Sequence, residues 1–316
     1  MRILFVKTSS LGDVIHHCPA VSDAARLVRG ARIDWVVEEA FADVPRLHRA
    51  VQRVIPVALR RWRRTPLRRS VRDEFAAFRR LLAEERYDRI VDTQGLLKSA
   101  LIARLARGPR HGYDRGSARE GVAARLYAAR HPVPRTLHAV ERNRRLTAAA
   151  LDYPVPQSAC DYGLRPASEA PVALDGPVCV LLTMSSRADK LWPPERWVAL
   201  GEALGRRGLR CALPWGSEAE RTRAAAIASR LDGAQVLPAL GIAGQAAQMA
   251  HAAAVVGVDT GLTHLAAALG RPTVGLYTST EPGLTGLYGP RAYSVGGRQS
   301  PPAVEAVLAA LDGLGR

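Results

Sequence analysis

The chain has 316 residues, of which 47% are hydrophobic, and a formal net charge of +16 from 45 Lys and Arg against 29 Asp and Glu. This length and apolar content suffice for two packed domains of about 150 residues each and exclude a chain without a core. No apolar run approaches the ~20 residues that cross a bilayer, and the N-terminus lacks the features of a signal peptide, so we expect a soluble cytosolic protein.

The positive charge is concentrated in the first half of the chain. Residues 1–160 carry 31 Lys and Arg against 16 Asp and Glu, a net of +15, whereas residues 161–316 carry 14 against 13, a net of +1. This asymmetry indicates that the first half meets a polyanion, and nucleic acid, an anionic membrane surface and an acidic substrate all fit.

Apolar runs that end in turn residues alternate with longer segments of helical period along the first half. The predicted strands are Arg2–Val6, Ile33–Val37, Val54–Val57 and Arg89–Asp92, and the predicted helices are Val14–Val28, Arg72–Glu85, Leu96–Ala106 and Ala139–Ala150. Residues 152–177 are rich in Pro, Ser and Ala without a sustained period, which predicts a linker.

The same alternation restarts after this linker. The predicted strands are Val178–Thr183, Arg210–Pro214, Ala234–Leu237, Ala254–Val258 and Thr273–Tyr277, and the predicted helices are Glu195–Arg207, Glu218–Leu231, Ile242–Ala252, Thr263–Gly270 and Pro302–Leu311. The last helix is expected to pack either on its own domain or back on the first. The pattern predicts an α/β fold of two Rossmann-like domains, 1–160 and 161–316, facing each other across a cleft, with ligands beyond the carboxyl ends of the strands.

The first predicted strand runs into the segment KTSSLGDVIHHCPAV at residues 7–21. This strand-to-helix corner lacks the G-x-G-x-x-G glycines of a dinucleotide site. It offers the carboxylate of Asp13 instead, where a phosphate would need amide donors. The residues alone do not give this carboxylate a function, and a cap at the start of the helix is one interpretation.

A second strand end, VVGVDTGLTH, suits phosphate oxygens. Asp259, Thr260 and Gly261 make a corner, and the helix that follows carries His264 in its first turn. Backbone amides at a helix N-terminus are a natural site for a diphosphate. Simple helix capping by Asp259 and Thr260 and a buried, hydrogen-bonded His264 are the alternatives.

Two further strand ends in the second half carry polar residues. In LLTMSSRADKLW, Ser185 and Ser186 precede Lys190, and these groups suit phosphate oxygens, with a solvated loop as the alternative. In ALPWGSEAERTRA, Glu218 or Glu220 lies near a helix start, where it either accepts hydrogen bonds from ribose hydroxyls or complements the helix dipole.

Six arginines surround one tryptophan in the stretch VALRRWRRTPLRR. They are Arg60, Arg61, Arg63, Arg64, Arg68 and Arg69. No acidic residue occurs between 57 and 71, so these charges repel one another unless an anion binds among them, and a solvated charged face is the alternative. Arginine forks bind carboxylate and phosphate bidentately. Further on, Lys98 lies one turn into a helix after the strand end VDTQGLLKSA.

Together these motifs resemble the family 9 glycosyltransferases, which have the two-domain GT-B fold. The resemblance is carried by KTSSLGDVIHHCPAV, DWVVEEAF, RRWRR, DTQGLLKSA, HAVERNR, LPWGS and VDTGLTHLAAALGRPTVGLYTSTEPG, in family order from residue 1 to about 290. Within the family, RRWRR and the T-Q-G-L-x-K segment favour the enzymes that add the first heptose of lipopolysaccharide, with those that add the next heptose as the alternative.

The resemblance implies an inverting transfer of L-glycero-D-manno-heptose from ADP-heptose to the inner Kdo of Kdo2-lipid A, by a monomer bound peripherally at the cytoplasmic face of the inner membrane. It implies Asp13 as catalytic base, with helix capping as the alternative, and Lys190 as the group that stabilises the diphosphate leaving group. The implied donor-binding residues are Ser185, Ser186, Lys190, Glu220, Leu240, Asp259, Thr260, Gly261 and His264. The implied acceptor-binding residues are Lys7, Arg60, Arg61, Arg63, Arg64, Lys98 and Arg119.

Two other classes fit the sequence less well. A nucleotide-dependent oxidoreductase needs a G-x-G-x-x-G corner with an acid ~20 residues on, and neither half offers one. A nucleic-acid binder fits the charge, but aromatic residues are only 5%, and Trp62 is the sole aromatic among the clustered arginines, which leaves no base-stacking platform. We also expect no metal, because no second carboxylate accompanies Asp259 at the expected donor site. The resemblance implies no cofactor, since ADP-heptose is the donor substrate.

Overall fold

The chain forms two compact units, Met1–Leu164 and Arg165–Arg316, whereas the sequence predicts a boundary at residue 160. The structure, a computed structural model, describes residues 1–166, 172–298 and 300–314. Part of the predicted linker, 167–171, lies outside the described residues. Its described parts, 153–166 and 172–177, contain neither helix nor strand, and Leu164 forms an isolated bridge with His48 of the first unit.

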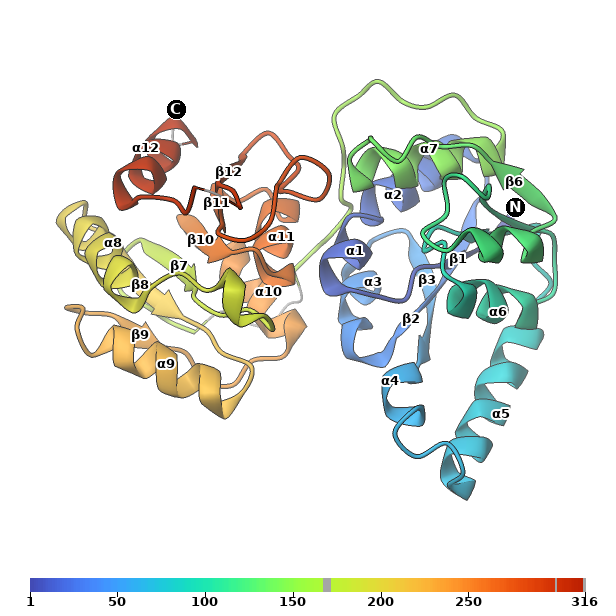
Figure 1. Cartoon of the computed structure of the whole chain (residues 1–316), viewed down its shortest axis with the longest axis horizontal. Helices are drawn as coiled ribbons and strands as arrows, with labels where there is room; N and C mark the ends of the chain where they lie inside the picture. The colour runs from blue at the N-terminus through green and yellow to red at the C-terminus, as the bar shows by residue number, and fades with distance from the viewer. Residues whose placement is uncertain (167–171, 299, 315–316) are drawn as a thin grey trace. The chain divides into compact units, whose positions relative to one another are not determined.

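The first unit is built on a six-stranded parallel sheet in the order β3-β2-β1-β4-β5-β6 (Figure 1). Its strands are β1 (Arg2–Val6), β2 (Arg32–Glu38), β3 (Val51–Val57), β4 (Arg89–Asp92), β5 (Arg110–Tyr113) and β6 (Ala129–His131). The strand order reverses between β1 and β4. The loops after these two strands therefore diverge, which is where an open α/β sheet binds its ligands.

Helices cover both faces of this sheet. Val6 belongs to one apolar cluster with Phe78 and Ile102, whereas Phe5 points to the opposite face and contacts His17, because neighbouring strand residues alternate between faces. The α-helices are α1 (Leu11–Ile15), α2 (Cys18–Leu27), α3 (Asp43–Leu47), α4 (Leu59–Trp62), α5 (Arg69–Ala83), α6 (Leu97–Leu105) and α7 (Ala139–Leu151). Two 3-10 helices are η1 (Glu39–Phe41) and η2 (Gly121–Leu126).

The four strands predicted for the first half are all present. The sequence does not predict β5 and β6, because the segments RHGY and ARH are short and contain no apolar run. The single helix predicted over Val14–Val28 is wrong, since the chain forms α1 and α2 instead. Pro19 has no backbone N–H for an α-helical hydrogen bond, so it opens a new helix. The break places the His17 ring against Phe5 and Trp35, with centroids 4.8 Å apart in each pair.

The second unit repeats the architecture, with the parallel strand order β12-β11-β10-β7-β8-β9. Its strands are β7 (Val178–Leu182), β8 (Arg210–Leu213), β9 (Gln235–Val236), β10 (Ala254–Val258), β11 (Thr273–Tyr277) and β12 (Ala292–Gly296). Its helices are η3 (Ala188–Lys190), α8 (Pro194–Arg206), α9 (Glu218–Ala228), α10 (Ile242–Ala250), α11 (Gly261–Ala268) and α12 (Val304–Leu314). Counted within each unit, both sheets have the same order, which confirms the predicted pair of Rossmann-like domains.

The end of the chain differs from expectation in two respects. The half-exposed segment AYSVG forms β12, which the sequence does not predict. The last helix, α12, packs on β11, β12 and α8 and buries Val307. Of the two packing alternatives, the helix therefore lies on its own unit. Within the described ranges, every helix is too short or too polar to cross a membrane.

Candidate active site

Polar side chains of the first unit gather beyond the ends of β1 and β4, where the strand order reverses. They surround a cavity of about 20 Å³, which has room for about one water molecule. The residues that line it are Lys7, Asp13, Thr93, Gln94, Tyr113, Arg119, Ala139, Arg142 and Asn143. This lining brings three cationic side chains to one carboxylate, a balance that suits an anionic ligand.

Lys7 is a buried cation at the end of β1. Its side chain donates from Nζ to the backbone oxygen of Thr93 at 2.9 Å and to Asn143 Oδ1 at 3.5 Å, and the residue is only 5% exposed. Burial lowers the pKa of Lys7 to about 8, although the negative charge of Asp13 opposes the shift. Lys7 is therefore still charged at neutral pH and lines the cavity.

Asp13 makes the contacts of a helix cap, and its role as general base stays a prediction. Its Oδ2 accepts hydrogen bonds from the backbone amide (3.0 Å) and the hydroxyl (3.2 Å) of Ser10, which precedes α1. Its Oδ1 accepts a hydrogen bond from Arg119 Nη2 at 3.1 Å. Burial raises the pKa of Asp13, but the charges of Lys7 and Arg119 and the Ser10 hydrogen bonds outweigh it, so the net shift is downward. The carboxylate is thus a helix cap and an ionised group in the cavity.

Several residues of this cavity are absent from the sequence-based site. Arg142 lies over the ring of Tyr113, with Cζ 4.8 Å from the centroid, and Asn143 donates from Nδ2 to the backbone oxygen of His16 at 3.0 Å. Both belong to α7, in the segment HAVERNR that contributes to the family resemblance. Gln94 lies in DTQGLLKSA, another segment that contributes to the family resemblance. The motifs contain these residues, but only the fold reveals which of their side chains reach the cavity.

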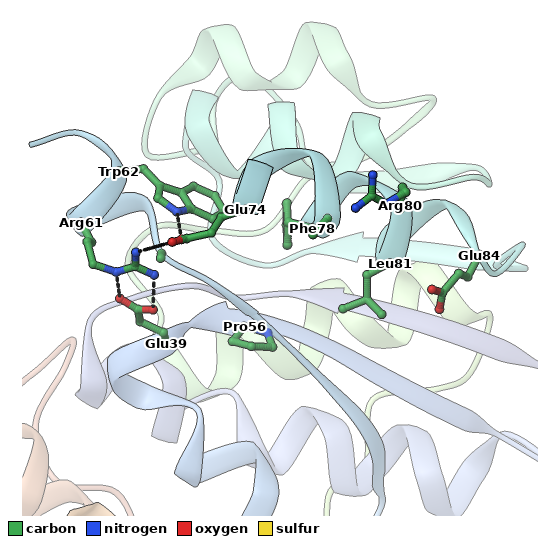
Figure 2. Close-up of a pocket in the computed structure, with 11 residues that line it drawn as sticks. Glu39, Pro56, Arg61, Trp62, Glu74, Phe78, Arg80, Leu81 and Glu84 are labelled. Atoms are coloured by element: carbon green, nitrogen blue, oxygen red, sulfur yellow. Dashed lines mark hydrogen bonds and ion pairs between the residues drawn. The ribbon is translucent and has the colours of Figure 1, made fainter. Parts of the chain in front are cut away.

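The clustered arginines lie at a different place in the first unit, on α4, the α4–α5 connection and the start of α5. Arg61 binds Glu39 through two hydrogen bonds of 3.0 Å and donates to Glu74 Oε1 at 2.9 Å, and Trp62 Nε1 donates to Glu74 Oε2 at 2.7 Å (Figure 2). The expectation that these charges repel one another unless an anion binds among them is therefore wrong for Arg61, because Glu39 and Glu74 from outside the acid-free stretch pair with it. These contacts hold α4 against α5 and η1.

Three other members of the arginine cluster are more available, whereas Arg69 Nε lies 4.0 Å from Asp73 Oδ2. Arg60 is exposed and lies over the ring of Phe41, with Cζ 4.9 Å from the centroid, and Arg63 and Arg64 are exposed. Lys98 is exposed on α6 and does not line the cavity that contains Asp13. Of the predicted acceptor residues, the cavity therefore brings together Lys7 and Arg119 only.

A larger cavity of the first unit, about 510 Å³, lies beside α4 and α5 and not beside Asp13 (Figure 2). Pro56, Phe78 and Leu81 contribute to its apolar lining, and its rim contains Arg61 with Glu39 and Glu74. These rim charges already pair with one another. We therefore regard the smaller cavity, with its excess of cations and its ionised carboxylate, as the candidate reaction site.

The second unit has a charged cluster beyond the ends of β7, β10 and β11. Lys190 Nζ donates to Asp259 Oδ2 at 2.6 Å, and Thr280 Oγ1 donates to the same oxygen at 2.8 Å. His264 Nε2 lies 3.6 Å from Asp259 Oδ1. Burial raises the pKa of Asp259, but hydrogen bonds from His264, Lys190 and Thr280 hold it well below its usual range. The sequence predicts three members of this cluster and misses Thr280, which lies in the segment TSTEPG.

The start of α11 is open for an anion. Thr260, the residue before the helix, makes no side-chain cap, and Asp259 directs its carboxylate to Lys190 instead, so the capping alternative is wrong for both. No described residue accepts a hydrogen bond from the amides of Gly261 and Leu262. Thr263 Oγ1 donates to the backbone oxygen of Val258 at 2.7 Å, which fixes the helix start at the end of β10. Backbone amides of this kind suit phosphate oxygens, and the diphosphate site itself stays a prediction.

The remaining predicted donor residues are not among the described partners of Asp259. Ser185 is partly exposed and Ser186 is exposed. Glu220 Oε2 accepts a hydrogen bond from the Gly216 amide at 2.7 Å, which favours its role at the start of α9, and Leu240 accepts one from Gln245 Nε2 at 3.1 Å. Within the part of the chain that the structure describes, no hydrogen bond or ion pair joins these side chains to Asp259. In that same part, no three or more His, Cys, Asp or Glu residues gather as a metal site would need.

Residues 75–308 match the model of the family described as Glycosyltransferase family 9 (heptosyltransferase). The chain belongs to this family. It is 51% identical over 290 residues to lipopolysaccharide heptosyltransferase 1 of Pseudomonas aeruginosa, a match that covers 92% of this chain and 82% of the relative. It is 46% identical over 291 residues to the protein of the same name from Escherichia coli K12, covering 92% of this chain and 91% of the relative.

Solved structures agree with this assignment to family 9. The E. coli heptosyltransferase WaaC with ADP matches with a TM-score of 0.94 and 42% identity, covering 99% of this chain and 100% of that one. The same enzyme with ADP-2-deoxy-2-fluoro heptose matches with a TM-score of 0.91 and 41% identity, covering 99% of both chains. E. coli ADP-heptose lps heptosyltransferase II has a TM-score of 0.79 at 22% identity over 99% of this chain and 98% of that one, which shows a common fold. The predicted family, fold class and glycosyltransferase class are confirmed.

Proposed function

We propose that this family 9 glycosyltransferase moves L-glycero-D-manno-heptose from ADP-heptose to a hydroxyl of the inner Kdo of Kdo2-lipid A, with inversion at the anomeric carbon. The observation that carries the proposal is the 51% identity to a lipopolysaccharide heptosyltransferase 1 over 92% of this chain. Likeness to a heptosyltransferase solved with ADP and with an ADP-heptose analogue supports the donor. Addition of the next heptose has less support, because the heptosyltransferase II structure is only 22% identical.

In the proposed step, Asp13 acts as the general base. The acceptor hydroxyl oxygen attacks the anomeric carbon while the bond from that carbon to the diphosphate oxygen breaks, and the hydroxyl proton passes to the Asp13 carboxylate. This transfer needs an ionised Asp13, and the low pKa of that group, which Lys7 and Arg119 maintain against the effect of burial, supplies it. The acidic groups of Kdo suit the same two cations, so Arg119 would share its guanidinium between Asp13 and the substrate.

On the donor side, Lys190 and the N-terminus of α11 hold the diphosphate. The amides of Gly261 and Leu262, together with the Lys190 ammonium, supply positive charge where the departing ADP gains negative charge. Asp259 holds Lys190 at the strand end through their 2.6 Å ion pair. With this charge in place, the proposed step uses no cofactor, and ADP-heptose is a substrate. Contacts from Ser185, Ser186, Glu220, Leu240, Thr260 and His264 stay predictions.

The exposed cations of the first unit serve the anionic acceptor and its membrane. Arg60, Arg63, Arg64 and Lys98 are exposed, and each basic residue near an anionic bilayer contributes about 1 kcal/mol of binding. Phosphates of lipid A and of the surrounding lipids are suitable partners. We therefore propose that the enzyme works as a monomer bound peripherally to the cytoplasmic face of the inner membrane.

The direct experiment is a transfer assay with Kdo2-lipid A that compares ADP-heptose with other nucleotide sugars, with and without EDTA. The proposal predicts transfer from ADP-heptose that EDTA does not change. Transfer only to an acceptor that already carries the first heptose would support the alternative substrate. Tight, salt-dependent binding of RNA without any sugar transfer would overturn the proposal in favour of a nucleic-acid binder.

A further inference from the structure

The turn after β4 is held by one buried carboxylate. Asp92 is fully buried, and its Oδ1 accepts hydrogen bonds from the backbone amides of Gln94 at 2.9 Å and Gly95 at 3.3 Å. Its Oδ2 accepts hydrogen bonds from Ser99 Oγ at 2.8 Å and from Tyr127 OH at 2.7 Å. Four donors on one carboxylate satisfy its burial and fix the turn against α6 and η2.

Gln94 extends from this fixed turn to the loop that carries Asp13. Its Oε1 accepts hydrogen bonds from the backbone amides of both Thr8, at 3.1 Å, and Ser9, at 3.2 Å. The next residue is Ser10, whose amide donates to Asp13. One carboxamide oxygen therefore ties the loop after β1 to the loop after β4, across the point where the strand order reverses.

The two amide donors also determine which way the Gln94 carboxamide is oriented. A backbone N–H pairs with the oxygen of a carboxamide and not with its nitrogen, so the NH₂ group lies on the other side of the side chain. Gln94 is only 3% exposed, yet it lines the cavity that contains Asp13. Its NH₂ group donates to no residue in the described ranges. A hydrogen-bond donor without a protein partner is therefore available in the same cavity as the carboxylate.

We infer that Gln94 has two roles in sugar transfer, one for the oxygen and one for the NH₂ group of its carboxamide. The oxygen makes Gln94 a positioning residue that holds the Asp13 loop, and the NH₂ group donates a hydrogen bond to an oxygen of the acceptor sugar. The inference rests on the proposed function, because it takes Asp13 as the base. A base displaced by about 1 Å loses about 10²-fold in rate, so the oxygen contact governs turnover.

Two variants separate the roles. Gln94→Met has a similar length and neither polar end, whereas Gln94→Glu keeps an oxygen for the Thr8 and Ser9 amides and loses the NH₂ group. For Gln94→Met, NMR-detected amide hydrogen exchange at Thr8 and Ser9 should become about tenfold faster, as expected for a lost hydrogen bond. Its kcat should fall about 10²-fold, while the Kd for ADP stays unchanged.

For Gln94→Glu, slow exchange at Thr8 and Ser9 should persist while the KM for the acceptor rises about tenfold, because one hydrogen bond to the substrate is lost. Gln52→Met is the matched control, since Gln52 is exposed on β3. This variant should leave exchange, kcat and KM as they are in the unaltered protein.

The outcomes distinguish this inference from the proposed function. Unchanged exchange at Thr8 and Ser9 in Gln94→Met would overturn the positioning role at any level of activity, because exchange is measured without substrate. An unchanged acceptor KM in Gln94→Glu would overturn the binding role. This measurement tests the binding role even if Gln94→Met does not fold. Full turnover by Asp13→Asn together with fast exchange in Gln94→Met would reject Asp13 as base and leave the loop contact established.

Discussion

Arg119 Nη2 lies 3.1 Å from Asp13 Oδ1, and this ion pair joins the loop after β5 to the helix after β1. The Arg119 side chain is 45% exposed, whereas that of Asp13 is 13% exposed. The guanidinium can therefore move toward a bound anion while the carboxylate stays in its cavity. The pair gives the site a resting state in which the proposed base is ionised and shielded from bulk water.

The first prediction concerns the effect of this pair on pH dependence. Burial raises the pKa of Asp13, and Lys7 and Arg119 lower it, so Arg119→Ala removes one lowering influence and must raise that pKa. A base works only when ionised, so the acidic limb of kcat/KM for the acceptor should move to higher pH. Arg115→Ala, at an exposed position of the same loop, is the control and should leave the limb in place. A limb that stays fixed or moves to lower pH in Arg119→Ala would contradict this account of Asp13.

The second prediction concerns the donor site. Lys190→Ala removes the ammonium that is proposed to bind the diphosphate and leaves Asp259 without its ion-pair partner. The Kd for ADP, measured by calorimetry, should rise about 10- to 10²-fold, the usual worth of a hydrogen bond to a charged group. Lys98→Ala makes the same change in the first unit and should leave ADP binding as it was. Equal losses in the two variants would count against a diphosphate site at Lys190.

The third prediction concerns the charge of the first unit. The double variant Arg60→Ala with Arg64→Ala should raise the KM for the acceptor on the order of tenfold, because two cations near an anionic surface are lost. Donor binding should not change. The control is Arg29→Ala with Arg130→Ala, which removes the same charge at exposed positions elsewhere in the unit. Equal weakening of ADP binding in the first double variant would contradict the proposed division between acceptor and donor sites.

Arg61 is the contrasting case within the same cluster. Because its guanidinium pairs with Glu39 and Glu74, Arg61→Ala should loosen α4 as well as remove a charge. Hydrogen exchange in residues 58–65 should become faster in Arg61→Ala and stay unchanged in Arg63→Ala. Equal exchange in both variants would show that the Arg61 pairs do not hold this segment.

Much of the fold could be predicted because its central strands are apolar along their whole length. Such runs as Ile3–Val6 and Ala254–Val258 are buried on both faces, so their sequences report strands directly. The edge strands β6 and β12 escape prediction because an edge position needs little apolar surface. The helix break at Pro19 was predictable in principle, since proline cannot donate the backbone hydrogen bond that a continuous helix requires.

The candidate site was predictable where polar residues lie in the segment that follows a strand, as at Lys7, Asp13, Lys190 and Asp259. What the sequence could not supply is the partner of each group. Arg119 reaches Asp13 from 106 residues away, and Thr280 reaches Asp259 from 21 residues away. These pairings depend on loops from different strands that meet at one edge of a sheet. Periodicity and spacing carry no information about such contacts.

The account depends most on Asp13 as the general base, and Asp13→Asn tests it most directly. Asparagine retains a carbonyl oxygen for the Ser10 amide, so the helix cap survives while the ability to take a proton is lost. The matched control is Asp43→Asn, since Asp43 lies in the first turn of α3 and pairs with Arg46 at 3.1 Å, as Asp13 does with Arg119.

The decisive measurement is the kcat for transfer from ADP-heptose to Kdo2-lipid A, alongside the Kd for ADP. We predict that Asp13→Asn lowers kcat by about 10²- to 10⁴-fold with ADP binding intact, whereas Asp43→Asn changes neither quantity. Near-normal turnover by Asp13→Asn would contradict the account and leave Asp13 as a helix cap alone.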